Sequence, residues 1–171
     1  KERVEYAQGL LANDIQTKNI ILLTGERYVK AGIDGPEDTL TALAQKYNLP
    51  NVSALTETHM LREIFETSPL SREGIKTYVI DTPAGELPRP TTQTTVEYLL
   101  DWLKSHQAIN NILFVTNQPY VKYQEAIIRT VLEAKRSNLG YQVVGPAATT
   151  DQIKPLLEAL GSYIWAQTPE A

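Results

Sequence analysis

The chain alternates short, strongly apolar runs with longer segments in which apolar residues recur every three or four positions. The short runs are rich in Ile, Val, Leu and aromatic residues, and Thr, Gly, Asp or Asn follows each of them. Runs this apolar are typical of parallel strands that are buried on both faces. The predicted strands are residues 19–23, 75–80, 112–115 and 141–144.

Helical spacing separates the predicted strands. The clearest case follows Thr92, where apolar residues from Val96 to Leu103 recur at i, i+3, i+4 and i+7. Thr91 or Thr92 is suited to cap this helix. Similar spacing predicts helices at residues 3–11, 37–47, 56–66, 120–136 and 153–160. We expect Asn138 and Gly140 to end the fourth of these.

The order of strands and helices predicts the fold class. Alternation of this kind favours an α/β fold with a three-layer, open, mainly parallel sheet and helices on both faces. A single domain accounts for residues 1–171. About fifty residues separate the first two predicted strands, more than a parallel crossover requires, and they hold two helical patterns, of which Gly35-Pro36 helps to start the first. Ligands bind such sheets at the carboxyl ends of the strands.

Composition and motifs exclude several functions. A net charge of −4 with scattered Lys and Arg argues against a nucleic acid polymer as partner. The lack of Cys excludes disulfides, Cys-based zinc sites and a thiol nucleophile, and leaves the compartment open. No apolar run approaches the roughly 18 residues of a membrane span. The glycine-rich dinucleotide, phosphate-loop and serine-hydrolase motifs are absent from the sequence.

Polar residues at the predicted strand ends are the candidates for ligand contact. Thr24-Gly25 is the best case, because Gly lets a backbone amide face an anion. Arg27 is placed either to pair with a phosphate or carboxylate, or to pair with Glu26 or Glu37 on the surface. Thr, Asn and Gly also form turns and helix caps, so a structural role stays open for each.

The segment 81–95, with three Pro and five Thr, is the most irregular part of the sequence. Long loops at the carboxyl end of a strand are commonly lids or binding loops. This loop leads into a predicted helix, where Thr hydroxyls and Arg89 are suited to hold an anionic group. The alternative is that Thr92 or Thr94 simply caps the helix.

Neither histidine has a partner at metal-ligand spacing. We therefore expect His59 to have a surface or packing role and His106 to have a structural role at a helix C-terminus. A carboxylate metal site stays open although no spacing selects it, and its ligands would come from Asp81, Glu57, Glu97 and Glu26.

The order of four motifs, IILLTGE, TETHML, TTQTTVEYLLDWL and ILFVTNQPYVKYQEA, resembles the bacterial YdcF/SanA/ElyC-like domain family of unknown function. The resemblance covers about Arg3 to Gly145, and it implies that residues 28–55 are a helical insertion. It implies a Rossmann-like fold, a link to the bacterial cell envelope and a nucleotide-like or otherwise anionic ligand, and it leaves the cofactor unknown. It also implies a further strand upstream of Arg3, and the compartment is then either the cytoplasm or the soluble part of an anchored envelope protein.

The resemblance and the strand ends together select the candidate site. The ligand-binding residues are expected to be Thr24, Gly25, Glu57, Thr92, Thr95, Thr116 and Asn117. Glu97 and Asp81 are the best available catalytic acid or base. The sequence departs from the family pattern at Tyr120 and Tyr123, which stand where the family has His and Arg.

Two functions are therefore carried forward. The first is binding of a small polar, anionic ligand, nucleotide-like or phosphate-bearing, at the carboxyl ends of the strands. The alternative is a non-catalytic protein-interaction module that has kept the fold and lost the site. Tyr120 and Tyr123 motivate the alternative, because tyrosine suits a protein contact better than an anion site.

Overall fold

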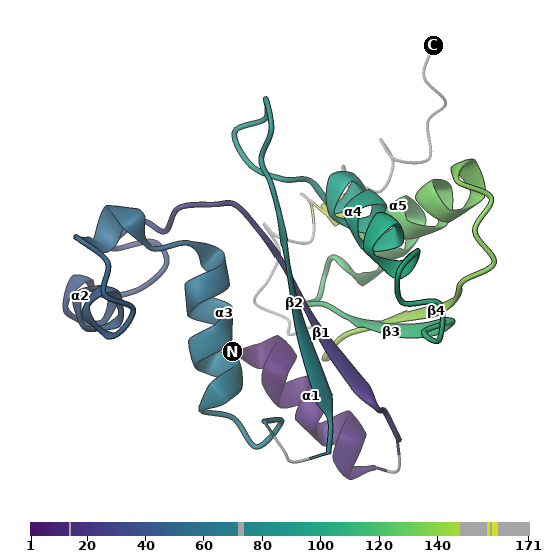
Figure 1. The fold of residues 1–171 in the computed structure, drawn as a ribbon, viewed down its shortest axis with the longest axis horizontal. Coiled ribbons are helices and arrows are strands. Elements are labelled where there is room, and N and C mark those ends of the chain that lie inside the picture. Colours follow the sequence, from purple (N-terminus) through teal and green to yellow (C-terminus); the bar gives the residue numbers. More distant parts are fainter. Residues whose placement is uncertain (14, 72–73, 148–156, 158, 161–171) are drawn as a thin grey trace. The chain divides into compact units, whose positions relative to one another are not determined.

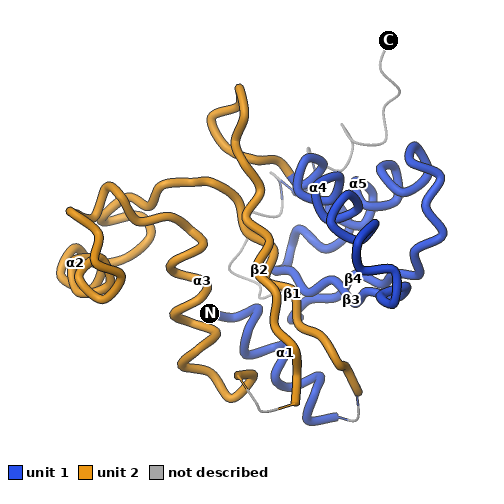
Figure 2. The backbone as a smooth tube through the Cα atoms, in the orientation of Figure 1, with its two compact units in different colours: residues 1–15, 92–171 blue, residues 16–91 orange. Residues whose placement is uncertain are grey.

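The computed structural model describes residues 1–13, 15–71, 74–147, 157 and 159–160. The chain divides into two compact units (Figure 2). Unit 2 is formed by residues 16–91, and unit 1 by residues 1–15 together with 92–171. Each unit contains one pair of parallel strands with helices, so the protein is an α/β protein.

Unit 2 is built on strands β1 (Asn19–Gly25) and β2 (Lys76–Thr82), which pair in parallel. The register places Asn19 opposite Lys76 and Gly25 opposite Thr82, so the two strands begin and end together. The long crossover between them contains α2 (Glu37–Lys46), the short 3-10 helix η1 (Val52–Ala54) and α3 (Glu57–Glu66). Helix α3 packs on β1 (Figure 1).

The segment predicted to be an insertion has a small core of its own. Its buried side chains are those of Val29, Leu40, Ala44 and Leu55. Pro36 is the N-cap residue of α2, and Glu37 and Asp38 follow it in the first turn, where they complement the helix dipole. Apolar packing and helix signals thus both favour helix in this segment, and its status as an insertion stays a prediction.

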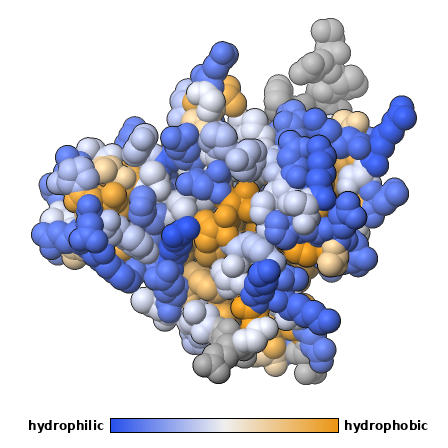
Figure 3. All heavy atoms as spheres, viewed as in Figure 1, coloured by the Kyte–Doolittle hydropathy of each residue, from blue (hydrophilic) through white to orange (hydrophobic). Residues whose placement is uncertain are grey.

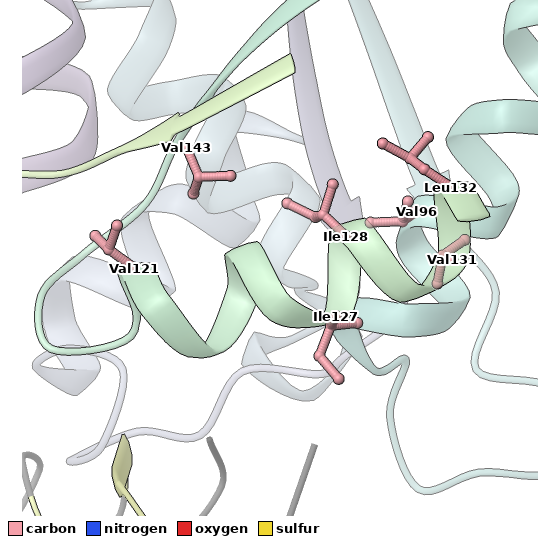
Figure 4. Close-up of a cluster of buried hydrophobic side chains, with 7 residues drawn as sticks. All are labelled: Val96, Val121, Ile127, Ile128, Val131, Leu132 and Val143. Atoms are coloured by element: carbon pink, nitrogen blue, oxygen red, sulfur yellow. The ribbon is translucent and has the colours of Figure 1, made fainter. Parts of the chain in front are cut away.

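Unit 1 contains α1 (Glu2–Ala12), α4 (Thr92–Leu103), β3 (Asn111–Val115), α5 (Val121–Ala134) and β4 (Gly140–Val144). Strands β3 and β4 pair in parallel from Asn111 opposite Gly140 to Val115 opposite Val144. The main core cluster joins α4, α5 and β4 (Figure 4), and its members are Val96, Val121, Ile127, Ile128, Val131, Leu132 and Val143.

All four predicted strands and five of the predicted helices are confirmed, with shifts at their ends. The predicted end of α5 was wrong, because the helix stops at Ala134 and Arg136 takes a positive φ of 49°. Gly140 lies instead at the start of β4, where a Cβ atom would collide with the Asn111 side chain. The helix predicted at 153–160 lies mostly outside the described residues. Union of the four strands into one three-layer sheet stays a prediction.

Hydrophilic residues make up most of the face drawn in Figure 3, with hydrophobic patches among them. Among the described residues, no helix combines the length and apolarity needed to cross a membrane. The large apolar side chains with the greatest exposure include Ile33, which is 76% exposed, and Tyr28. Both belong to the segment that follows β1.

Truncation of Ile128, a core residue of α5, tests the packing of unit 1. Ile128 is 2% exposed at the centre of the cluster in Figure 4. We expect Ile128→Ala to lower the free energy of unfolding by about 2–5 kcal/mol, because it removes buried methylene groups and leaves a cavity. Urea denaturation measures the change. The exposed Glu133→Ala on the same helix is the control and leaves the free energy nearly unchanged.

Candidate functional site

The predicted site residues divide between the two units. Unit 2 contains Thr24, Gly25, Glu57 and Asp81, at the carboxyl ends of β1 and β2 and in the first turn of α3. Unit 1 contains the remaining predicted residues, which are Thr92, Thr95 and Glu97 on α4, and Thr116 and Asn117 after β3.

A chain of hydroxyl groups joins α3 to the strand ends in unit 2. The Thr58 hydroxyl donates to Thr24 Oγ1 at 2.9 Å, and both side chains are buried. Thr24 Oγ1 in turn donates to the Ile80 carbonyl at 3.2 Å and approaches Asp81 Oδ1 at 3.4 Å. The predicted pair Thr24 and Asp81 is therefore brought together, and Thr58 joins it although sequence reasoning did not select that residue.

Gly25 and Thr82 lie on the opposite face of the strand pair. They are opposite each other in the register, one position beyond Thr24 and Asp81, and successive side chains of a strand alternate between faces. A Cβ atom at Gly25 would lie 2.8 Å from Pro90 Cγ, so proline covers this glycine. The Thr82 hydroxyl is buried and has no hydrogen-bond partner among the described residues. The close approach that requires glycine is thus made by Pro90.

Arg27 is neutralised by carboxylates of unit 2. Its Nη1 and Nη2 atoms donate to Asp34 Oδ2 and Oδ1 at 3.1 and 2.7 Å. Its Nε donates to Glu57 Oε2 at 3.4 Å. A two-pronged guanidinium–carboxylate pair of this kind is strong and directional. Of the alternatives left open by the sequence, pairing with a carboxylate of the protein is the one observed, with Asp34 and Glu57 as partners.

The pairing shifts the titration of both groups in unit 2. The hydrogen bond from Arg27 is the largest cause that lowers the pKa of Asp34, and the Lys30 amide also donates to that carboxylate at 2.8 Å. The hydrogen bond to Asp34 is likewise the largest cause that raises the pKa of Arg27. Because the Arg27 guanidinium stays charged and is paired with carboxylates of the protein, its role is to stabilise the 27–34 segment.

Backbone hydrogen bonds and a capping box hold the start of α3. The amide of Glu57 donates to the Arg27 carbonyl at 2.9 Å, and the amide of Val29 donates to the Leu55 carbonyl at 3.0 Å. Thr56 and His59 form a capping box, in which the His59 amide bonds the Thr56 side chain and the His59 ring bonds the Thr56 amide. Several amides that a helix N-terminus offers to an anion are therefore already used.

Sequence reasoning missed this role of His59. The usual capping-box signature has Ser or Thr followed three residues later by Glu or Gln. Thr56 is at the first position, and His59 takes the place of the acid or amide. The signal was present in the spacing, but the residue type at its second position concealed it.

The strand ends of unit 2 carry an excess of negative charge. Asp81 is exposed, and among the described residues its carboxylate has only the long contact with Thr24. Glu26 Oε2 accepts a hydrogen bond from the Ala84 amide at 3.2 Å. Within the described part of the chain, no three His, Asp or Glu side chains gather to hold a metal ion, so the carboxylate metal site has no support there.

In unit 1, the predicted residues after β3 are enclosed by the chain. Thr116 is buried, and its amide donates to the Val144 carbonyl at 2.9 Å. A Cβ atom at Gly145 would lie 2.6 Å from the Thr116 carbonyl oxygen. Asn117 Oδ1 is buried without a hydrogen-bond partner in the described residues. This amide oxygen is the unsatisfied polar atom of the unit 1 candidates.

The start of α4 carries the other unit 1 candidates. Helix α4 begins at Thr92, so Thr94 lies inside the helix. Gln93 Nε2 donates to Glu97 Oε1 at 3.4 Å, and Thr95 and Glu97 are half-buried. The predicted anion site at this helix start remains a prediction.

The tyrosines of unit 1 differ in their surroundings. Tyr123 is half-buried and packs against the core cluster of α5. Tyr120 is the N-cap residue of α5, whereas Tyr98 on α4 is exposed. Tyr123 therefore contributes to the packing of unit 1.

Unit 2 also has an open pocket of about 430 Å³ between α2 and the segment that follows it. None of the predicted site residues lines it. The lining residues are Glu37, Thr41, Ala44, Gln45 and residues 49–53.

Comparison with protein-family models, with curated proteins and with solved structures gives no match for this chain. The resemblance to the YdcF/SanA/ElyC-like family rests on the order of short motifs and stays a prediction.

Substitution of Gly25 tests the contact with Pro90. We expect Gly25→Ala to lower the free energy of unfolding by about 1–3 kcal/mol, because the added methyl group overpacks the space that the proline ring fills. The same change at Gly9, which lies inside α1 with nothing within 4 Å, raises stability by about 0.5–1 kcal/mol. Urea denaturation compares the two. Failure of Pro90→Ala to restore the Gly25→Ala variant would contradict this origin of the loss.

Removal of the Asp34 charge tests the Arg27 pair. Because the native pKa of Asp34 is lowered, its contribution to stability is present above the unfolded pKa of about 3.9 and is lost as the pH falls through the native pKa. We expect Asp34→Asn to lower the free energy of unfolding by about 1–3 kcal/mol at pH 7, and the difference from wild type to shrink below about pH 3.

Asp101→Asn is the matched control for this prediction. Asp101 pairs with Lys104 at the surface, where both side chains are largely exposed, so we expect no measurable change. Denaturant unfolding at several pH values measures both variants. A difference between wild type and Asp34→Asn that stays constant down to pH 2 would rule out the ion pair as its source.

Proposed function

We propose that the carboxyl end of the β1–β2 pair binds a small polar ligand on the face that α3 covers. The observation that carries the proposal is the exposed Asp81 carboxylate beside the buried Thr24–Thr58 hydroxyl chain. Ligands of α/β proteins bind outside the carboxyl ends of parallel strands, and β1 and β2 end together at this edge.

The chemistry of this edge favours a ligand with hydroxyl or amine donors. An ionised carboxylate only accepts hydrogen bonds, and Asp81 retains most of its accepting capacity. The nearest guanidinium, Arg27, is bound to Asp34 and Glu57, so it does not offer its charge to an anion. The part of the ligand that lies against this edge is therefore a hydroxyl-bearing part.

We propose that the ligand is of the nucleotide-like or phosphate-bearing class that the sequence suggests. Such a ligand would meet Asp81 through its sugar hydroxyls, in the manner of an acid that binds a ribose at the end of a parallel strand. The Thr58–Thr24 hydroxyl chain ends beside this carboxylate, whose Oδ1 lies 3.4 Å from Thr24 Oγ1. Membership of the YdcF/SanA/ElyC-like family, a Rossmann-like three-layer sheet and a link to the cell envelope belong to the same proposal.

In the same proposal, Asp81 is the group of unit 2 that can exchange a proton with a ligand hydroxyl. Glu97, half-buried on α4, is the corresponding group of unit 1. Thr92, Thr95, Thr116 and Asn117 are a separate candidate set within unit 1, where the buried amide oxygen of Asn117 needs a donor. A donor on a ligand of unit 1 would satisfy it.

The second candidate is a protein-interaction module without catalysis. It is favoured because two groups that were expected to hold an anion are already engaged within the protein. Pro90 covers Gly25, and the carboxylates of Asp34 and Glu57 bind Arg27. The packing of Tyr123 into the core favours it as well. The two candidates differ in one measurable property, which is binding of small molecules.

A ligand panel tests the proposal. It contains adenosine 5′-phosphate, its 2′,3′-dideoxy analogue, S-adenosylmethionine, ribose 5-phosphate and inorganic phosphate. We expect the ribose-bearing molecules to raise the unfolding temperature, and the dideoxy analogue and inorganic phosphate to leave it unchanged. Calorimetric titration is expected to show about tenfold weaker binding to Asp81→Asn, since a hydrogen bond to a charged group contributes about 1.5–3 kcal/mol.

The control is Asp38→Asn, which removes an exposed aspartate on α2 of the same unit and should bind as wild type does. No response to any member of the panel would reject the ligand proposal and favour the interaction module. Equal binding of the ribose and dideoxy forms would reject Asp81 as the hydroxyl acceptor.

A further inference from the structure

We propose that the His59 imidazole is a pH switch for the first turn of α3, which is capped while the ring is neutral and loses half of its cap when the ring is protonated. The consequence for ligand binding rests on the function proposed above. The consequence for the helix does not, because it follows from the hydrogen bonds of Thr56 and His59 alone.

The hydrogen-bond geometry of the capped turn assigns the protonation state of the His59 ring. The Thr56 amide lies 3.1 Å from His59 Nδ1, and an amide N–H can only donate. Nδ1 must therefore carry a lone pair, which places the ring proton of the neutral imidazole on Nε2. The reciprocal bond, from the His59 amide to Thr56 Oγ1, completes the capping box.

Protonation sets two donors against each other. Once Nδ1 carries a proton, it faces the Thr56 N–H, and that amide loses its acceptor. The new N–H can turn only to Thr56 Oγ1, which lies 2.9 Å from Nδ1, and it would then share that oxygen with the His59 amide and leave the Thr56 N–H unpaired. The imidazolium would also place a positive charge in the first turn of the helix, where the dipole disfavours a cation.

Apart from Thr56, the described residues supply no hydrogen-bond acceptor for the protonated ring. Among the described residues, Thr56 is the hydrogen-bond partner of the ring, and Tyr47 of α2 meets it edge-on with centroids 5.0 Å apart. Burial is the largest cause that raises the pKa of Tyr47, so its phenol stays neutral in acid. The other titratable or charged side chains adjoining this corner are Tyr28, Lys46, Glu57, Arg62, Glu63 and Glu66.

The neighbouring carboxylates already have cationic partners. Glu63 is paired with Lys46, and Glu57 is paired with Arg27. Arg62 contributes another positive charge on the same helix. The carboxylates of this corner are thus engaged by other cations.

The switch acts on the residues of the proposed site. The first turn of α3 carries Glu57, whose amide bonds the Arg27 carbonyl, and Thr58, whose hydroxyl bonds Thr24. Loss of the Thr56 bond loosens this turn and with it the hydroxyl chain that leads to Asp81. A ligand that depends on this chain is therefore released more readily in mild acid, where an imidazole takes up its second proton.

Thermal unfolding at pH 7.5 and pH 5.5 tests the switch in the full chain. His59→Gln is the decisive variant, because glutamine at this position accepts the N-cap amide bond and does not titrate. We expect the unfolding temperature of wild type, measured relative to His59→Gln, to fall by about 2–4 °C between the two pH values, as one capping interaction is lost. The control is His106→Gln, which removes the only other histidine of the sequence. We expect its unfolding temperature to fall between the two pH values as that of wild type does.

A fall of the same size in His59→Gln would overturn the proposal. If that variant does not fold, the wild-type chain decides the question by nuclear magnetic resonance. The amide resonance of Thr56 is expected to move with the midpoint of the His59 ring titration, and an amide that stays in place would overturn the proposal. Neither readout needs a ligand, so both stand apart from the ligand panel, whose failure leaves them unchanged.

Discussion

The parallel, in-register pairing of β1 with β2 is the constraint on which the candidate site depends. Strands that run in the same direction end at the same edge, which places Thr24 beside Asp81 although the two residues are far apart in sequence. The same pairing forces the chain to return by a crossover, and the last helix of that crossover, α3, brings Thr58 to the same edge. Alternation along the strands then separates this face from that of Gly25 and Thr82.

The elements were predictable where local physics decides them. The four apolar runs became strands and five amphipathic segments became helices, because burial of an apolar face is encoded in short windows of sequence. Helix ends were less predictable. Just after the end of α5, Arg136 takes a left-handed conformation, which no signal in the sequence indicates for an arginine. Gly140 serves instead to let β4 pack closely on Asn111.

The site was predictable only in part, because partner choice is a property of the folded chain. Strand ends identified Thr24 and Asp81 correctly as neighbours, but the sequence offered Arg27 several carboxylates and gave no means to choose Asp34. Gly25 signalled a close approach without showing that Pro90 makes it. Thr58 was not selected and the capping role of His59 was missed, because both roles depend on hydroxyl and ring-nitrogen geometry rather than on residue type.

The turn at residues 30–35 is closed by its own hydrogen bonds. The amides of Ile33 and Asp34 both donate to the Lys30 carbonyl, and the Gly32 amide donates to the Gly35 carbonyl. The Arg27 guanidinium also binds the Asp34 carboxylate. Ile33 stands at its exposed tip. Since the sequence has no cysteine, Ile33→Cys would give a single attachment point for a fluorophore or spin label. Such a probe would report from the neighbourhood of α3 without replacing any side chain that bonds there.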